Sequence, residues 1–328
     1  MDRRTFLVWV AALSPSRLAG AQPAHKIARV GVITAGFTSA EMKGPNPSSA
    51  TVGALLRGLR DLGYEYGKDF VTDPRGGEGQ TEQYAELAAE LVRLSPDVIV
   101  AGGPTLPAVM QATSTIPIVM VGGALDPVRD GFAGSLGRPG GNVTGLSIQQ
   151  VDTTAKRLEI LNELVPTATV AVLWEATSRS SWHVAETAAR ARGWKVVSLE
   201  VNNDADVKRA FKMADSAGAR ALLVLSGGRI FGRRQQVVDL AGVNRLPAMY
   251  SLRSFVDAGG LMSYAADLTD AWRRSATFVD RVLKGAKPAE MPIEQSTNFE
   301  LVINLRTAKA LGVTVPRALL LRADQVIE

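Results

Sequence analysis

Short apolar runs rich in Val, Ile and Leu alternate with helical patterns along most of the chain. Such runs, set between amphipathic helices, are typical of strands buried on both faces of a parallel sheet. The runs form two blocks, at residues 27–33, 70–73, 97–100 and 118–121 and then at 169–173, 195–201, 221–225 and 248–251. The repeated block predicts an α/β fold with two related lobes.

A single barrel of eight strand–helix units is the alternative architecture, and it requires regular repeats without a break. Residues 131–145 interrupt the repeats with six glycines and Pro139, as a connector does. After the second block we expect a strand at 259–264, a helix at 268–283 with Leu268 and Trp272 on its apolar stripe, and a strand at 299–304.

The first 21 residues have the pattern of an export leader. Arg3 and Arg4 precede a short apolar stretch, and Ala19 and Ala21 supply the small residues of a cleavage site. The paired arginines also resemble a twin-arginine signal, and the general secretory route stays open. A buried N-terminal helix is the alternative, but Pro15 would break it. We expect a signal peptide at residues 1–21, cleaved near Ala21, and a periplasmic protein.

Composition excludes several classes of function. The chain has no cysteine and two histidines among 328 residues, so neither a disulfide nor a metal site is expected. The formal net charge is +5 without any block of Lys and Arg, so we expect no nucleic-acid partner. The sequence contains no apolar run of about 18 residues, so we expect no membrane-spanning helix.

No motif for nucleotide binding or catalysis is complete. Residues 63–69 (GYEYGKD) are one residue short of a phosphate-binding loop and end in Asp, and no G-x-S-x-G sequence occurs. A catalytic triad would have to use His25, near the expected cleavage site, or His183, within a predicted helix. We therefore expect no enzyme activity and no cofactor.

Small and polar residues gather where the predicted strands end, at the edge where open parallel sheets bind ligands. Turn geometry alone also favours Gly and Ser there, so a single loop says little. Six such loops in two blocks favour a ligand cleft between the lobes. The candidate ligand-binding residues in or beside these loops are Phe37, Gly103, Thr105, Asp126, Ser147, Trp174, Ser226, Tyr250 and Asp267.

Four stretches resemble one family of ABC-transporter substrate-binding proteins, and the resemblance covers essentially the whole chain. They are residues 136–145 (LGRPGGNVTG), 126–128 with Gly131, 259–264 (GGLMSY) and 299–312 (FELVINLRTAKALG). The resemblance implies a type I periplasmic binding fold, with two Rossmann-like lobes joined by three crossovers. It also implies a bound small solute, an aromatic amino acid in some members, and a membrane permease as partner.

On this basis we expect residues 22–145 with 263–296 to form one lobe, and 146–262 with 297–328 to form the other. Hinges are expected near 142–145, 260–264 and 295–298, where glycine and polar residues join the blocks. The chain departs from the family pattern in two loops of the second lobe, at 174–177 (WEAT) and 226–229 (SGGR). Because both loops are expected to face the ligand, the family's ligand does not carry over.

The sequence thus predicts a monomeric, exported solute-binding component of an ABC importer, which closes its lobes around an amino acid or aromatic carboxylate. Thr105 is expected to cap a helix and to contact an anion. Asp126 or Asp267 would face an amine, and the aromatic candidates would stack on an apolar body. The alternatives are the ligand-sensing domain of a regulator or receptor and a periplasmic enzyme on the same fold.

Overall fold

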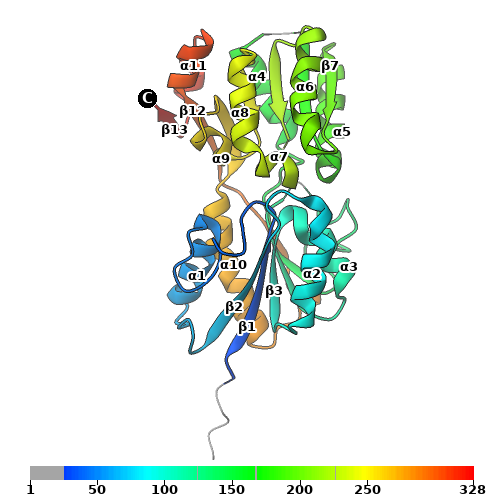
Figure 1. Ribbon diagram of the computed structural model, residues 1–328, viewed down its shortest axis with the longest axis vertical. Coiled ribbons are helices and arrows are strands. Elements are labelled where there is room, and N and C mark those ends of the chain that lie inside the picture. The colour runs from blue at the N-terminus through cyan, green and yellow to red at the C-terminus, as the bar shows by residue number, and fades with distance from the viewer. Residues whose placement is uncertain (1–25, 124, 167, 226) are drawn as a thin grey trace, which may run out of the picture.

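The computed structural model describes residues 26–123, 125–166, 168–225 and 227–328, and it consists of two α/β lobes, one above the other in Figure 1. The expected signal peptide and Ser226 lie outside the described residues. No helix in the described part of the chain has both the length and the apolar character needed to cross a lipid bilayer.

The first lobe contains a six-stranded sheet in the order β11-β5-β4-β3-β1-β2, and all its neighbouring strands are parallel. Its central strands are buried on both faces, as their continuous apolar runs predict. The strands are β1 (Ala28–Thr34), β2 (Phe70–Gly76), β3 (Val98–Gly102), β4 (Ile118–Val121), β5 (Val143–Ser147) and β11 (Ile293–Gln295).

Two pairs of helices cover this sheet. Helices α1 (Ala50–Asp61) and α10 (Leu268–Leu283) pack together on one face, and α2 (Tyr84–Arg93) and α3 (Leu106–Ala112) pack together on the other (Figure 1). The contact between α1 and α10 is close, since a Cβ on Gly58 would lie 2.2 Å from the Arg273 carbonyl oxygen. Short 3-10 turns are η1 (Thr81–Gln83), η2 (Gly103–Thr105) and η4 (Pro288–Glu290).

The second lobe contains a seven-stranded sheet in the order β13-β12-β10-β9-β8-β6-β7, in which β10 and β12 are antiparallel and the other pairs parallel. The strands are β6 (Thr169–Trp174), β7 (Lys195–Glu200), β8 (Ala221–Val224), β9 (Ala248–Tyr250), β10 (Met262–Ala266), β12 (Phe299–Asn304) and β13 (Gln325–Ile327). The helices are α4 (Thr154–Leu164), η3 (Ala176–Ser178), α5 (Arg179–Arg190), α6 (Asp204–Ser216), α7 (Gly228–Gly232), α8 (Arg234–Val243), α9 (Arg253–Asp257), α11 (Leu305–Leu311) and α12 (Arg317–Leu320).

The chain passes between the two sheets three times, at residues 148–153, at Asp267 and at 296–298. The expected hinge at 295–298 agrees with the third passage, but the ranges 142–145 and 260–264 are wrong, because they run into β5 and β10. The glycines there allow close packing: a Cβ on Gly145 would lie 2.2 Å from the Met120 carbonyl oxygen. The lobe boundary expected at residue 263 also falls inside β10.

Hydrogen bonds tie the three passages together. The Gln149 side-chain amide donates to the Ser296 carbonyl at 2.7 Å, which joins the first passage to the third. The buried Arg157 guanidinium donates to the carbonyls of Gln150 at 2.9 Å and Tyr264 at 2.7 Å, which joins the first passage to β10, the strand before the second passage. These bonds couple the passages, so we expect them to bend as a unit.

Candidate ligand-binding site

A pocket of about 560 Å³, counting the part open to solvent, lies between the lobes at the carboxyl ends of the central strands. Both lobes and the first passage contribute its walls. The lining residues are Thr34, Ala35, Gly36, Phe37, Thr51, Gly102, Gly103, Pro104, Val121, Gly123, Ile148, Gln150, Gly227, Phe231, Leu252, Leu268 and Trp272.

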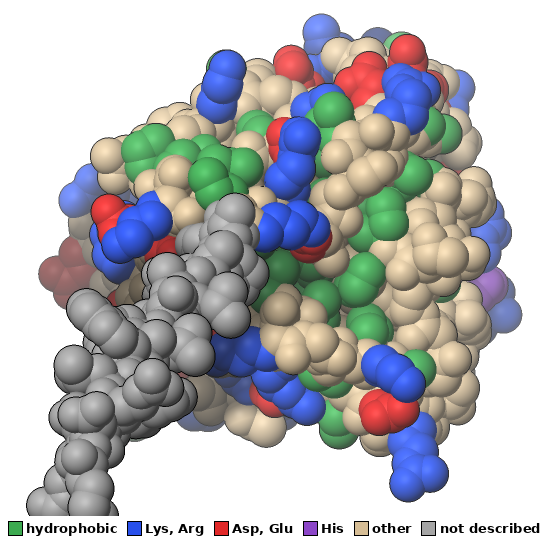
Figure 2. Space-filling view, turned by 90° about the horizontal axis from the view of Figure 1, so that it is seen from below, with side chains coloured by type: hydrophobic (Ala, Val, Ile, Leu, Met, Phe, Trp, Pro, Cys, Tyr) green, Lys and Arg blue, Asp and Glu red, His purple; other side chains and the backbone are tan. Residues whose placement is uncertain are grey.

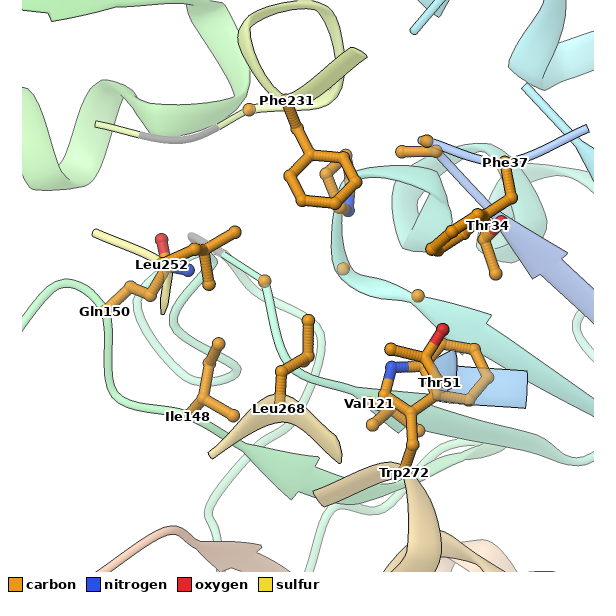
Figure 3. Close-up of a pocket in the computed structure, with 17 residues that line it drawn as sticks. Thr34, Phe37, Thr51, Val121, Ile148, Gln150, Phe231, Leu252, Leu268 and Trp272 are labelled. Carbon is orange, nitrogen blue, oxygen red and sulfur yellow. The ribbon is translucent and has the colours of Figure 1, made fainter. Parts of the chain in front are cut away.

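The pocket wall is mainly apolar and aromatic. Figure 3 shows Phe231 reaching from the second lobe into the space between Phe37 and Leu252, with Leu268 and Val121 opposite it. The Phe37 and Phe231 rings meet edge to face, with centroids 6.5 Å apart. Such walls favour a flat apolar or aromatic body in the ligand.

Besides the indole N–H of Trp272, three polar side chains line the pocket, and none of them is ionisable. Thr34 donates its hydroxyl hydrogen to the Met42 sulfur at 3.2 Å, and the Thr51 hydroxyl lies 3.2 Å from that of Ser49. The side-chain amide of Gln150 makes no hydrogen bond to another described residue, so it is available to a ligand.

A second hollow adjoins the pocket and shares part of its wall, including Phe37 and Thr51. Asp267 lies here and accepts hydrogen bonds from the backbone N–H groups of Thr269 and Asp270, which caps α10. Asp257 and Glu300 also line this hollow, and both pair with Arg253.

The two lobes touch beside the pocket, where α7 of the second lobe meets η1 and α2 of the first. Arg229 on α7 donates to the Thr81 hydroxyl at 2.9 Å and pairs with Glu82, while Asp204 holds it from its own lobe at 3.2 Å. A Cβ on Gly228 would lie 2.1 Å from the Tyr84 hydroxyl oxygen. Because α7 also carries Phe231, one short helix contributes both to the pocket wall and to the contact between the lobes.

A buried carboxylate holds α7 in place. The Glu175 oxygens accept the backbone N–H groups of Arg229 and Ile230 at 3.1 and 3.0 Å, and Oε1 accepts the Thr177 hydroxyl at 2.8 Å. Burial raises the pKa of Glu175, and these hydrogen bonds act in the opposite direction. Glu175 therefore supports the pocket wall from behind Gly227, where a Cβ would lie 2.0 Å from its Oε1.

Of the residues expected from the sequence, Phe37 and Gly103 line the pocket, and Asp267 lines the adjoining hollow. A Cβ on Gly103 would lie 2.2 Å from the Gly123 Cα, so the loops after β3 and β4 pack backbone to backbone. Glycine at position 103 is required for that contact. Ser226 lies outside the described residues.

Thr105 stands at the N-cap position of α3, as expected, but its side chain makes no capping hydrogen bond. The helical turns begin earlier, at Gly103, so Thr105 lies inside the first turns and makes no side-chain cap. Its buried hydroxyl donates to the Gly102 carbonyl at 2.9 Å, and its side chain does not line the pocket. A residue of this type within a helical turn commonly bonds to the preceding turn.

We expect Thr105→Val to lower the free energy of unfolding by about 1 kcal/mol, because it removes one buried hydrogen bond. Ligand affinity should stay within a factor of two, since the hydroxyl does not reach the pocket. Denaturant titration and calorimetry measure the two effects, with Thr105→Ser as the control that keeps the hydroxyl. A tenfold loss of affinity in the valine variant alone would contradict this placement.

The other expected residues serve their own lobes. Trp174 stacks on Trp182 with centroids 5.3 Å apart and donates to the Ser198 hydroxyl at 2.8 Å. Tyr250 is buried against Phe255, with centroids 5.0 Å apart. The remaining two stabilise local turns. The Asp126 carboxylate accepts hydrogen bonds from the backbone N–H groups of Val128 and Arg129, and the buried Ser147 hydroxyl accepts one from the backbone N–H of Gln149.

Sequence reasoning missed part of the wall. Phe231 and Leu252 follow the strand-end loops rather than lie in their first positions, and Thr51 lies in the first turn of α1. Leu268 and Trp272 belong to the apolar stripe of α10, and a stripe gives no sign of which end reaches a ligand. The helices α1, α7 and α10 thus also contribute to the pocket wall.

The model of the ABC transporter substrate binding protein family matches residues 43–327, and the chain belongs to this family. It is 26% identical over 266 residues to a protein named tyrosine-binding protein from Clostridioides difficile, and the match covers 79% of this chain and 75% of that protein.

Solved structures agree with this assignment. A conserved domain protein from Vibrio cholerae superposes with a TM-score of 0.82 at 28% identity, covering 92% of this chain and all of that one. An ABC domain in complex with L-Trp from Streptococcus pneumoniae has a TM-score of 0.81 at 25% identity, with the same coverage. Two parallel-dominated sheets joined by three passages confirm the predicted type I periplasmic binding fold.

Proposed function

We propose that this protein is the exported solute-binding component of an ABC importer, and that it binds a small solute with an aromatic or flat apolar body between its lobes. The observation that carries the proposal is the apolar pocket walled by Phe37 and Trp272 from one lobe and by Phe231 and Leu252 from the other. A solute that touches both walls stabilises the closed form, which the permease then recognises.

Relatives support an aromatic ligand, since one is named for tyrosine and another was solved with L-Trp. Export through the leader at residues 1–21, delivery to permease subunits, a monomeric state and the absence of catalysis belong to the same proposal. The proposal includes no nucleic-acid partner. On the face shown in Figure 2, Lys and Arg side chains are interspersed with acidic and hydrophobic ones rather than gathered in one basic patch.

A thermal-shift screen over amino acids, aromatic acids and other small solutes should find ligands. A ligand at 100 times its Kd adds about 2.7 kcal/mol to the free energy of unfolding. Small-angle scattering of the complex should then give a smaller radius of gyration than that of the free protein. Saturation without any change of radius, from an open free form, would reject closure, and turnover of the bound solute would favour the enzyme alternative.

A further inference from the structure

Among the described residues that line the pocket, no side chain carries a negative charge that could neutralise a ligand ammonium. None of its 17 lining residues is Asp, Glu, Lys, Arg or His. An ammonium group moved from water into such a site loses hydration that no carboxylate replaces. A site of this kind selects ligands by the shape of the apolar body and disfavours an unpaired cation.

The carboxylates nearest to the pocket already have partners. Glu175 lies behind Gly227, is 4% exposed and accepts two backbone N–H groups and one hydroxyl. In the adjoining hollow, Asp267 caps α10, and Asp257 and Glu300 pair with Arg253. An incoming ammonium would have to displace these interactions.

The buried charge beside the pocket that lacks a counter-charge is positive. Arg157 is 1% exposed and lies directly behind Gln150, to whose carbonyl it donates. Its Nη2 has no hydrogen-bond partner, and no salt bridge joins it to a carboxylate among the described residues. Burial lowers the pKa of Arg157 to about 9, so the guanidinium remains charged at neutral pH. Its field opposes a cation in the pocket and favours an anion.

From the uncharged wall and the unpaired Arg157 we infer that the ligand of this protein is an aromatic or flat apolar carboxylate without an amine, rather than an amino acid. The inference rests on the proposed function, since it names the solute class for the same pocket. The Gln150 amide and backbone N–H groups along the wall would contact the carboxylate, and the aromatic wall would hold the body.

Three probes on one skeleton test it: 3-(indol-3-yl)propionate, L-tryptophan and tryptamine, which carry the carboxylate alone, both groups and the amine alone. A second set is 3-phenylpropionate, L-phenylalanine and 2-phenylethylamine. Calorimetry should show each propionate binding at least tenfold more tightly than its amino acid, with the amine weakest. Equal binding, or tighter binding of an amine-bearing probe, overturns the inference.

A matched pair of variants separates charge from shape. Thr51 lines both the pocket and the adjoining hollow and lies in the first turn of α1, where Asp and Asn are both tolerated. Thr51→Asp should raise the affinity for tryptamine at least tenfold and lower that for indolepropionate, whereas Thr51→Asn should change their ratio less than threefold. The same response in both variants contradicts the inference.

The failure of the inference differs from the failure of the proposed function. If solutes from the broad screen bind and close the lobes but neither propionate does, the solute class is wrong and the transport role stands. If no solute in the screen binds the folded wild-type chain, the proposed function itself fails, and this inference fails with it.

Discussion

Gly145→Ala should lower the free energy of unfolding of the first lobe by about 4 kcal/mol, from backbone strain and steric overlap together. Gly145 has a φ of 125°, and its added Cβ would lie 2.2 Å from the carbonyl oxygen and 2.7 Å from the nitrogen of Met120 on β4. Neither backbone atom can move without breaking the pairing of β4 with β5. Thermal unfolding should show a midpoint about 10 °C lower.

Gly140→Ala is the matched control for this prediction. Gly140 also has a positive φ, of 80°, but no atom lies within 4 Å of its added Cβ. The strain of a left-handed alanine alone should lower stability by about 1–2 kcal/mol. Equal losses in the two variants would show that the contact with Met120 has no energetic weight.

Gly228→Ala should lower the affinity for every ligand about 100-fold while leaving the free energy of unfolding nearly unchanged. The added methyl group would lie 2.1 Å from the Tyr84 hydroxyl oxygen across the cleft, so it opposes the approach of α7 to the first lobe. The open form accommodates the methyl group, and alanine is a good residue in a helix. Scattering at ligand saturation should show incomplete closure.

The double variant Gly228→Ala with Tyr84→Phe tests the steric cause. Without the hydroxyl, the nearest ring atom would be 3.1 Å from the methyl group, and most of the lost affinity should return. Gly242→Ala in α8 is the control, because no atom lies within 4 Å of its added Cβ and it is remote from the cleft. If Tyr84→Phe restores nothing, the contact with α7 does not limit closure.

The fold was predictable because a strand buried on both faces of a sheet has a continuous apolar run in the sequence. The runs at 27–33, 97–100 and 118–121 correspond to β1, β3 and β4, and the later block corresponds to β6 through β9. Glycine was the misleading signal. The glycines at 140–145 predict a hinge that includes Gly145, whereas Gly145 lies within a strand where neighbouring backbones come close.

The site was less predictable, since the direction of a side chain at a strand end depends on tertiary packing. Trp174 and Phe37 both stood beside predicted strand ends, yet Trp174 stacks on Trp182 within its lobe while Phe37 faces the cleft. The partners that decide this, Trp182 and Phe231, belong to other elements. A sequence pattern that ends at the loop does not include them.

The position of α10 has a consequence for how the molecule assembles. This helix packs against α1 and covers one face of the first sheet, yet the chain reaches it only after most of the second lobe. A chain that emerges from its N-terminus therefore exposes the apolar face of β1, β3 and β4 until residues 268–283 arrive. The lobe whose synthesis begins first therefore gains its covering helix only after most of the second lobe has been made, which delays its folding.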